Sequence, residues 1–502
     1  MKKALALVLS ICMLLAAAPA FALDLLSGAD TYPLTTDKTI TFYDQGAINP
    51  HEKYASWKES PFHTGLIEMT GVNIEFSFPT TGTDGGVYTN TLLADPTSLP
   101  DIMGISCMNQ ANQYLADEVI WDLTDYIQEY APAYYAFLQT NPAYDKAMKT
   151  DDGRYYAFGF FREDGGWNDT YLGPVVRTDW LEECGLDYPK TMSEFENVIR
   201  VFNEKYGAKF SFAWSRFKTT GLAQAQPEWR TYLSWLNKLY EEGLLDTDCL
   251  SLDDTSIKAK IHNDQVGISI TSMGQLNNWN KERIADGKEA VWVGSPYPHG
   301  DDGTLSMVFG GYGIGNNTYV VTKCADEETM KLCLQLLDYG FTAEGHLYWN
   351  FGKQGVSWDY DENGEVQLTE LVTNDPDTDP ITKYGGQTWS GCGIQATKLL
   401  YMKNSELAIQ ANDTWFYENE DVTASWKWPT GTTYTTEEQD ELDIISGALG
   451  TYTAESFANF LTGALDIDDD AVWEKYIADY SNYNLDRIRE IRQACYDRYM
   501  AR

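Results

Sequence analysis

The feature that most constrains the fold is a repeated alternation of short apolar segments with longer amphipathic ones. Residues 39–43 (TITFY), 72–78 (VNIEFSF) and 100–106 (PDIMGIS) are typical of strands that lie in a sheet. Residues 57–69, between the first two strands, and 110–118, after the third, are predicted to be helices. Strands that alternate with helices predict an α/β protein, because each helix carries the chain back across a sheet.

Helix predictions are strongest where a capping signal precedes a periodic apolar pattern. Thr191 and Glu194 form a capping box. The apolar residues behind this box recur at helical spacing: Phe195, Val198, Ile199 and Phe202. Two further segments repeat the spacing, with Trp229, Tyr232, Leu233, Leu236 and Tyr240 in one and Met330, Cys333, Leu334 and Leu337 in the other. Each of the three is predicted to be a helix that buries one face.

The first 22 residues have the composition of a secretory signal peptide. Lys2 and Lys3 precede an apolar run that ends in the small-x-small cleavage site Ala20-Phe21-Ala22. We expect cleavage after Ala22 and an extracytoplasmic location, in the periplasm or at the outer face of the cell membrane. Ile11 precedes Cys12, where a lipid-attachment site needs a small residue, so the mode of retention at the cell surface is left open. Residues 23–502 are too many for one compact core, which predicts more than one domain.

Charge and composition narrow the range of partners. The chain carries 75 acidic and 36 basic residues, with a formal net charge of −39. Nucleic acid is therefore not an expected partner, because phosphate contacts need clustered lysine and arginine. The 16 tryptophans and 33 tyrosines favour carbohydrate contact, since flat rings cover the apolar faces of sugars.

The sequence contains no recognisable catalytic or metal-binding signature. There is no G-x-S-x-G, H-E-x-x-H or Walker motif, and the five histidines are scattered. Of the 8 cysteines, one lies in the signal peptide, and the others lack CxxC spacing and are expected to be small buried hydrophobic residues. We therefore expect no catalytic residues and no cofactor, although a glycosidase that uses two of the many carboxylates is left open.

Residues 359–370 fit two different structures. Four residues occupy positions 1, 3, 5 and 12 of an EF-hand calcium loop: Asp359, Asp361, Asn363 and Glu370. The segment also predicts a β-hairpin with residues 362–364 as its loop, which pairs Tyr360 with Val366 and Trp358 with Leu368. An EF-hand needs a helix before its loop, whereas the preceding segment contains two glycines and alternates like a strand. The hairpin is the preferred prediction, and a weak calcium site is the alternative.

Seven segments together carry a resemblance to a known protein family. They are LPDIMG (99–104), GRYYAFGF (153–160), VVRTDWLEECGLDYPKTMSEF (175–195), YLSWLNKLYEEGLLDTD (232–248), QVGISI (265–270), EETMKLCLQLLDYGFTAEGHLYWNFGKQGVSWDYDENG (327–364) and FLTGALDI (460–467). In this order they resemble the extracellular solute-binding proteins of family 1, the capture components of ABC importers, and especially the oligosaccharide branch.

The resemblance implies a type II periplasmic-binding-protein-like fold, in which hinge strands join two α/β lobes and a ligand binds in the cleft between them. Lobe 1 is expected at residues 36–160 and 300–357, and lobe 2 at residues 161–299 and 358–502. Lobe closure would then report occupancy to the transporter.

Ligand-binding residues are expected in loops at the carboxyl ends of strands, where open α/β sheets bind their ligands. The candidates are Asn109, Arg162, Trp167, Trp214, Arg216, Gln275, Trp279, Tyr312 and Trp389. Trp167, Trp279 and Trp389 are the expected stacking platforms, and Asn109, Arg162, Arg216 and Gln275 the expected partners of hydroxyl or carboxylate groups. For Trp279, three flanking asparagines predict a loop instead of a core position. Trp229 and Trp473 follow helical patterns and are expected in the core, and Trp426 and Trp428 are candidates for the cleft rim that the sequence does not place.

The sequence therefore predicts a monomer that captures a sugar or oligosaccharide and delivers it to the permease subunits of an ABC importer. A secreted carbohydrate-active enzyme and the binding subunit of a sugar sensor are the alternatives. The identity and length of the ligand are left open.

Overall fold

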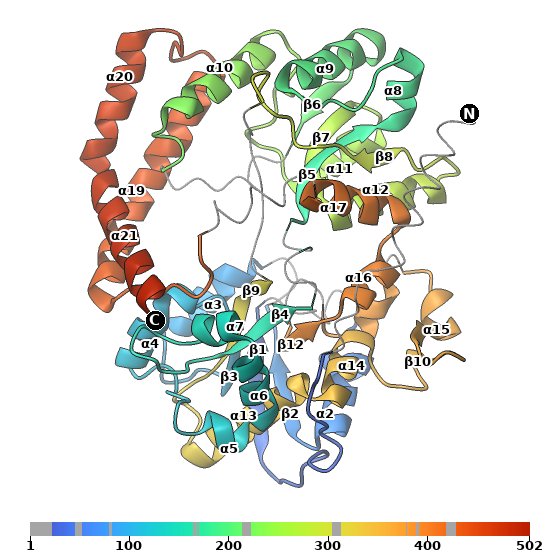
Figure 1. The fold of residues 1–502 in the computed structure, drawn as a ribbon, viewed down its shortest axis with the longest axis vertical. Helices are drawn as coiled ribbons and strands as arrows, with labels where there is room; N and C mark the ends of the chain where they lie inside the picture. Colours follow the sequence, from blue (N-terminus) through green and yellow to red (C-terminus); the bar gives the residue numbers. More distant parts are fainter. Residues whose placement is uncertain are drawn as a thin grey trace.

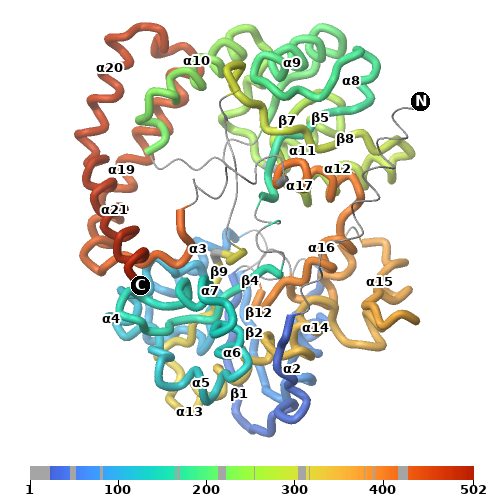
Figure 2. Tube along the Cα trace, viewed as in Figure 1, coloured from blue at the N-terminus to red at the C-terminus, as the bar shows by residue number. Residues whose placement is uncertain are grey.

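The computed structural model describes residues 23–45, 53–79, 83–163, 167, 170–212, 222–303, 313–377, 379–387, 391–417 and 428–502. These residues form two α/β lobes, one above the other in Figure 1, and each lobe is built on its own sheet. The C-terminal helices run beside both lobes (Figure 2). The predicted α/β class is confirmed.

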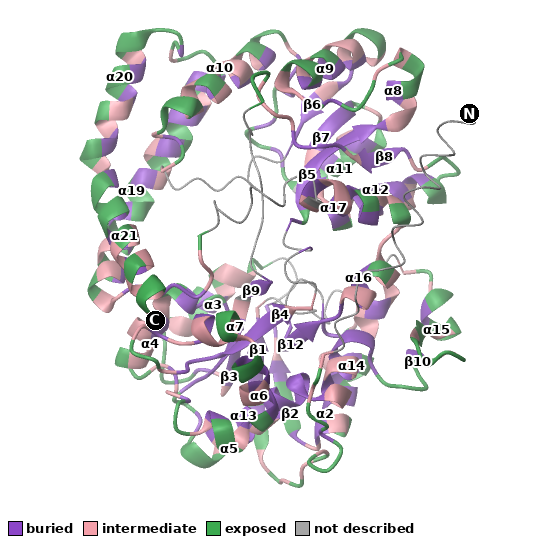
Figure 3. Ribbon diagram, in the orientation of Figure 1, coloured by how far each residue is buried: buried purple, intermediate pink, exposed green. Residues whose placement is uncertain are grey.

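The first lobe is built on a six-stranded sheet with the order β12-β4-β9-β3-β1-β2. Its strands are β1 (Thr39–Asp44), β2 (Asn73–Ser77), β3 (Ile102–Ile105), β4 (Phe158–Arg162), β9 (Ile314–Val321) and β12 (Gly393–Gln395). β1 is parallel to β2 and β3, whereas β9 is antiparallel to β3 and β4. All four residues of β3 are buried, which explains the continuous apolar character of its sequence (Figure 3).

Helices surround the first sheet. They are α2 (Pro61–Thr70), α3 (Gly85–Leu93), α4 (Ala111–Ala116), α5 (Ile127–Tyr130), α6 (Pro132–Thr140), α7 (Pro142–Ala147), α13 (Glu327–Asp338) and α14 (Ala343–Phe351). The helix predicted over 57–69 is divided into a short 3-10 helix, η2 (Trp57–Glu59), and α2, because Pro61 starts a new helix at a position that needs no backbone N–H. The helix predicted over 110–118 is η3 (Met108–Gln110) followed by α4.

The second lobe is built on a four-stranded sheet with the order β6-β7-β5-β8. Its elements are β5 (Leu172–Arg177), β6 (Lys209–Ser211), β7 (Val266–Ser272), β8 (Trp292–Gly294), α8 (Thr178–Cys184), α9 (Met192–Tyr206), α10 (Pro227–Glu241), α11 (Asp254–His262), α12 (Met273–Ala285) and α17 (Glu406–Tyr417). α16 (Thr397–Lys403) contacts both lobes, since Leu399 packs with Phe351 and Leu400 packs in the cluster of Trp292. The capping box predicted at Thr191 and Glu194 is confirmed at the start of α9. Phe195, Val198 and Phe202 of α9 are buried against this sheet, as the helical spacing predicted.

Three C-terminal helices form an arm that connects the two lobes along one side (Figure 1). They are α19 (Thr436–Leu461), α20 (Asp470–Asp479) and α21 (Leu485–Ala501). With 26 residues, α19 is about 39 Å long, and it contacts α10 of the second lobe and α4 of the first. Leu442 of α19 and Ile488 of α21 share a hydrophobic cluster with Phe210 of β6, so the arm belongs to the core of the second lobe.

The predicted lobe boundary at residues 357/358 does not match the sheets. Residues 358–502 were assigned to lobe 2, but β12 is parallel to β4 in the first sheet, where Gly393 lies opposite Phe160. The hairpin strand at Trp358 also packs with Phe351 of α14. The chain therefore stays with the first lobe until it has completed β12.

The segment that fits both a calcium loop and a hairpin is a hairpin. β10 (Trp358–Tyr360) is antiparallel to β11 (Val366–Leu368) in the predicted register, with Trp358 opposite Leu368 and Tyr360 opposite Val366. Asp361 Oδ1 accepts hydrogen bonds of 2.8 Å from the backbone N–H groups of Asn363 and Glu365. These bonds stabilise the turn from within. The hairpin prediction is confirmed.

The cysteines agree in part with the expectation that they are small buried residues. The seven cysteines after the signal peptide are all free; five of them are buried, Cys184 is partly exposed and Cys324 is exposed, contrary to expectation. No helix in the described ranges combines the length and the apolar character that crossing a membrane requires.

Candidate functional site

A pocket of about 530 Å³ lies where the first lobe meets the C-terminal arm. One wall consists of the residues that directly follow β3, and the other consists of residues 428–434, α19 and α21. The lining residues are Ser106, Met108, Asn109, Gln110, Trp428, Pro429, Thr430, Gly431, Thr432, Tyr434, Gln439, Leu442, Asp443, Ser446, Leu449, Gly450, Ile488 and Arg492. Met108 belongs to the hydrophobic core of the first lobe and Leu442 to that of the second, so the pocket is an interlobe site.

The first wall follows from the sheet. β3 ends at Ile105, and η3 then turns the chain so that Asn109 is exposed at the carboxyl end of the strand. The second wall is fixed to this turn by the backbone, since Tyr434 N donates to Asn109 O at 3.1 Å. Asn112 Nδ2 donates to Tyr434 O at 2.8 Å. The two walls are therefore joined by hydrogen bonds.

One face of α19 forms the long side of the pocket. Gln439, Leu442, Asp443 and Ser446 recur at helical spacing and all line it. Gln439 Nε2 donates to Asp443 Oδ1 at 2.7 Å. Gly450, one turn further along, leaves open space beside the helix. This face of α19 offers hydrogen-bonding groups near Gln439 and Asp443, and Gly450 has no side chain to fill the space at the other end.

An aromatic ring and a guanidinium group form the opposite side. Trp428 is 43% exposed, and its Nε1 donates to Thr432 Oγ1 at 3.0 Å, which fixes the orientation of the indole. The Arg492 guanidinium lies 5.7 Å from the centroid of that indole. Burial raises the pKa of Tyr434, and neighbouring Arg492 partly opposes that rise through its charge and through a side-chain hydrogen bond to the phenol. An exposed indole next to a cation is a surface suited to a ligand with both apolar and polar faces.

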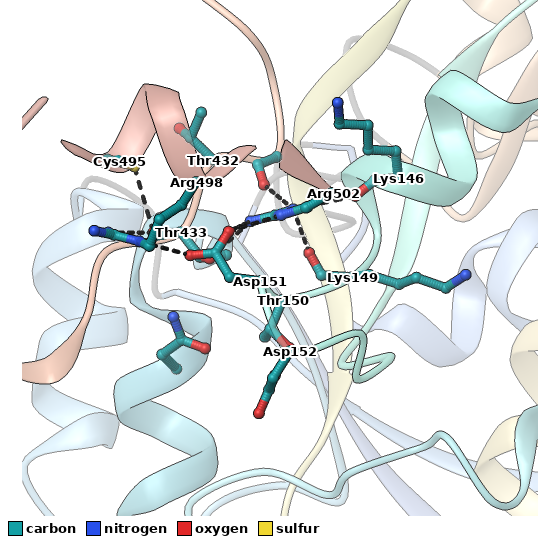
Figure 4. Close-up of polar contacts among 12 residues, drawn as sticks. Lys146, Lys149, Thr150, Asp151, Asp152, Thr432, Thr433, Cys495, Arg498 and Arg502 are labelled. Carbon is teal, nitrogen blue, oxygen red and sulfur yellow. Dashed lines mark hydrogen bonds and ion pairs between the residues drawn. The ribbon is translucent and has the colours of Figure 1, made fainter. Parts of the chain in front are cut away.

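Two arginines at the end of α21 anchor the arm to the first lobe (Figure 4). Arg498 Nε and Arg502 Nε donate to the two carboxylate oxygens of Asp151, at 3.0 and 2.8 Å. Arg502 Nη1 also donates to Gly431 O at 2.9 Å, and Arg498 Nη1 donates to Glu438 Oε1 at 2.8 Å. The network therefore holds residue 431 and the start of α19, two parts of the pocket wall, against the turn that contains Asp151.

Of the predicted ligand residues that lie in the described ranges, only Asn109 lines this pocket. Arg162 ends β4, and its backbone N–H bonds to Gly313 O. Gln275 lies in the first turn of α12, where its backbone N–H is capped by Ser272 Oγ. Neither lines the pocket. The predictions at Trp214, Arg216, Tyr312 and Trp389 fall outside the described residues.

The expectation that Trp279 lies in an exposed loop is wrong. Residues 273–285 form α12, and Trp279 is 3% exposed within a hydrophobic cluster. Its ring meets Trp292 of β8 edge-on, with centroids 5.4 Å apart. Trp229 and Trp473, both expected in the core, belong to the hydrophobic cluster of the second lobe: Trp473 is 9% exposed, and Trp229 is partly buried on α10 against that cluster.

Trp167 is also buried, but it has polar partners. Its Nε1 donates to Asp413 Oδ1 at 2.8 Å, and its ring stacks on Tyr401 with an interplanar angle of 9°. Asn412 Nδ2 donates to Trp167 O at 2.8 Å. These contacts attach residue 167 to α16 and α17 and leave 4% of the side chain exposed.

Sequence reasoning missed Arg492, Asp443 and most of the second wall. These residues lie more than 300 positions after Asn109 and occupy helix faces that the sequence presents as ordinary amphipathic surface. The only available signal was Trp428, which stands in a stretch that contains Pro429 and Gly431 and thus favours a turn.

Comparison with known proteins agrees with this architecture. No protein-family model matches the chain. The chain is 22% identical over 370 residues to the fructooligosaccharide ABC transporter substrate-binding protein FusA of Streptococcus pneumoniae, a match that covers 65% of each chain. It is 23% identical over 325 residues to the polygalacturonan/rhamnogalacturonan-binding protein YtcQ of Bacillus subtilis, which covers 56% of this chain and 59% of YtcQ. The chain spans about half to two thirds of the length of the curated relatives it matches.

Among solved structures, the alginate-binding protein AlgQ2 without calcium ion superimposes with a TM-score of 0.76. The match covers 93% of this chain and 99% of that one, at 19% identity. The fold is therefore that of the two-lobed, type II periplasmic-binding-protein-like class. The resemblance to extracellular solute-binding proteins is confirmed, since the relatives include ABC transporter substrate-binding proteins.

Proposed function

We propose that this protein is an extracytoplasmic substrate-binding protein that captures a sugar or oligosaccharide between its lobes and delivers it to an ABC importer. The pocket between η3 and the C-terminal arm is the observation that carries the proposal. Its volume of about 530 Å³ lies within the range of roughly 300–1,000 Å³ typical of small-molecule sites. Sugar-binding relatives of the same fold support the ligand class.

The pocket chemistry suits a carbohydrate. Trp428 offers an exposed ring for the C–H face of a sugar, and Asn109, Gln439 and Ser446 offer amide and hydroxyl groups for its hydroxyls. Hydroxyl groups gain little net energy by exchanging water for protein partners. Much of the affinity must therefore come from the area buried on the indole.

The enzymatic alternative is disfavoured by the carboxylates of the pocket. A glycosidase that acts through a pair of carboxylates needs two of them on either side of the scissile bond. Asp443 is the only carboxylate among the described residues that line this pocket. Binding without cleavage is the activity that the pocket supports.

The proposed partners are a carbohydrate ligand and the permease subunits, and the proposed state is a monomer. Lobe closure upon ligand binding would present the transporter with a different surface. The expected order of events is capture, closure and docking.

A ligand screen tests the proposed function. Thermal unfolding of the mature chain is measured with neutral and acidic mono- and oligosaccharides, and a true ligand at 100 times its Kd raises the free energy of unfolding by about 2.7 kcal/mol. Chromatography of the same mixtures is expected to return every glycan uncut. A stable, well-folded protein that no saccharide stabilises, or that cleaves one, contradicts the proposal. A sensor subunit would bind equally well and is distinguished by a neighbouring kinase gene instead of permease genes.

A further inference from the structure

The charges around the pocket point to a narrower ligand class, an inference that rests on the proposed function. Most arginines elsewhere in the described chain have carboxylate partners. Ion pairs are formed by Arg154, Arg177, Arg200, Arg230, Arg283, Arg487, Arg489, Arg498 and Arg502. This is the expected state for a chain with 75 acidic and 36 basic residues.

Arg492 is different. No carboxylate of the described residues lies within 4.0 Å of its guanidinium, although it stands only one turn of α21 from the paired Arg489. Its Nε is buried and has no hydrogen-bond acceptor in the part of the chain that the structure describes. Nevertheless, the side chain lines the pocket and lies beside the ring of Trp428.

An incompletely paired guanidinium at a partly buried position is costly unless something else supplies the negative charge. Arginine presents a planar fork of donors that matches a carboxylate with two parallel hydrogen bonds. The position beside Trp428 also fits a sugar that stacks on the indole and carries its carboxylate at the ring edge. A ligand carboxylate would therefore complete the hydrogen bonding of Arg492.

The opposite wall has a different character. Asp443 is exposed, so its charge is hydrated, and one of its oxygens already accepts from Gln439. Its remaining acceptor capacity suits the hydroxyl donors of a sugar. The pocket thus has a donor end at Arg492 and an acceptor end at Asp443, an arrangement that matches a saccharide bearing both a carboxylate and free hydroxyls.

We propose that this pocket selects carboxylate-bearing saccharides, such as uronate oligosaccharides, with Arg492 as the partner of the carboxylate and Trp428 as the stacking platform. Selectivity arises because a neutral sugar would leave the guanidinium incompletely paired in the closed protein. Arg492 is then a specificity-determining residue.

Titration calorimetry with matched ligands tests the proposal. Trigalacturonate is compared with the neutral galactose trisaccharide of the same linkage, and acetate serves as a carboxylate without a sugar. We expect the uronate to bind at least tenfold more tightly than the neutral trisaccharide, with an affinity that falls as salt is raised, and acetate to bind negligibly. Equal affinity for the two trisaccharides, or preference for the neutral one, overturns the selectivity while leaving the proposed function intact. Tight binding of acetate alone would show a general anion site and would also overturn it.

Variants on α21 locate the effect. Arg492→Gln is expected to weaken uronate binding by about 10- to 100-fold and to change binding of the neutral trisaccharide less than threefold. Arg489→Gln, one turn earlier and outside the pocket, is the matched control and should change neither. If Arg492→Gln does not fold, Arg492→Lys keeps the charge, loses the fork and is expected to show a smaller loss in the same direction. Equal weakening of both trisaccharides contradicts the role of Arg492. If the folded parent binds neither trisaccharide, the uronate proposal fails, and the proposed function is decided separately by the wider saccharide screen.

Discussion

Two tryptophans from polar stretches of the chain lie in opposite environments. Trp279 stands among asparagines, and its side chain is 3% exposed in the core of the second lobe. Trp428 stands between a lysine and a proline, and it is 43% exposed at the pocket. The sequence made the first the better ligand platform, and the structure reverses the order.

The asparagines around Trp279 explain the reversal. Asn280 Oδ1 accepts from the backbone N–H groups of Val291 and Trp292, at 3.2 and 3.0 Å, and its Nδ2 donates to Trp292 O at 2.8 Å. Asn277 Nδ2 donates to Lys403 O at 3.3 Å. These side chains are buried because they satisfy the backbone of neighbouring segments. A polar sequence therefore indicates exposure only where no backbone partner is available.

Trp428 remains exposed for a local reason. Gly431 has φ 89°, and a Cβ at that position would lie 2.5 Å from Ala147 Cα. Gly431 therefore packs directly against Ala147 at the end of α7. This contact holds the turn against the first lobe. The indole of Trp428, three residues earlier, remains partly exposed at the pocket.

The largest expected effect is on the stability of Trp279→Ala. Truncating a buried tryptophan costs about 3–5 kcal/mol, so the variant should unfold at much lower denaturant concentration than the parent. Affinity for the ligand should be unchanged in the protein that still folds. Denaturant unfolding and titration calorimetry measure the two quantities. Normal stability combined with lost binding would restore the original interpretation of Trp279.

Asn280→Ala tests whether the buried asparagine hydrogen bonds stabilise the region around Trp279. The variant leaves three backbone groups of residues 291 and 292 without their side-chain partner, which is expected to cost about 2–3 kcal/mol. Asn278→Ala is the matched control, because Asn278 lies on the same helix, is partly exposed and makes no comparable hydrogen bond within the described ranges. It should change stability by less than about 0.5 kcal/mol. Similar losses for both variants would show that the buried hydrogen bonds are not the cause.

The sequence predicted those parts of the molecule that depend on local signals. The capping box at Thr191, the hairpin register at Trp358–Leu368 and the buried strand before Asn109 each follow from a few neighbouring residues. The second pocket wall and β12 could not be predicted, because they depend on which distant segments meet. β12 has three residues, and only its pairing with β4 shows to which lobe it belongs.

Buried titratable groups of the first lobe make the free energy of unfolding depend on pH. Burial lowers the pKa of His63 to about 3 and that of His346 to about 4. In the unfolded chain both histidines bind protons below about pH 6.5, so their contribution to stability is full above that pH and is lost as the pH falls. At about pH 5 each histidine is expected to lower the free energy of unfolding by about 2 kcal/mol.

Asp338 acts in the opposite direction. Burial raises the pKa of its carboxyl to about 7, so its contribution to stability is present below the unfolded value of about 3.8 and is lost as the pH rises through 7. Together the three groups predict that the free energy of unfolding is about 2 kcal/mol lower at pH 5 than at pH 7. Asp338→Asn removes the compensation, and its loss over the same interval should be about 4 kcal/mol. Parallel pH profiles for parent and variant in denaturant unfolding would contradict this assignment.

Trp428→Ala completes the pair of tryptophan variants. Loss of the stacking surface is expected to cost about 2 kcal/mol of binding free energy, or roughly thirtyfold in Kd. Stability should change by less than about 0.5 kcal/mol, because the indole is 43% exposed. Calorimetric titration with the best ligand of the screen measures the first quantity and a melting curve the second. A variant that melts early but binds normally would place Trp428 in the core and leave the pocket without its platform.

The smallest expected effect concerns the third polar stretch, the hairpin at residues 358–368. Here the acidic side chains are exposed, but Asp359 and Asp361 already accept hydrogen bonds from nearby backbone and from Gln354, which lowers the pKa of both carboxyls. Carboxylates that satisfy their own turn have little reason to bind an ion. Calcium or a chelator should therefore change the free energy of unfolding by no more than a few tenths of a kcal/mol through this segment. A calcium-dependent rise in Tm that Asp359→Ala with Glu370→Ala abolishes would show that the hairpin can rearrange into a metal site. An equal rise in parent and double variant would place the ion elsewhere and leave the hairpin as described.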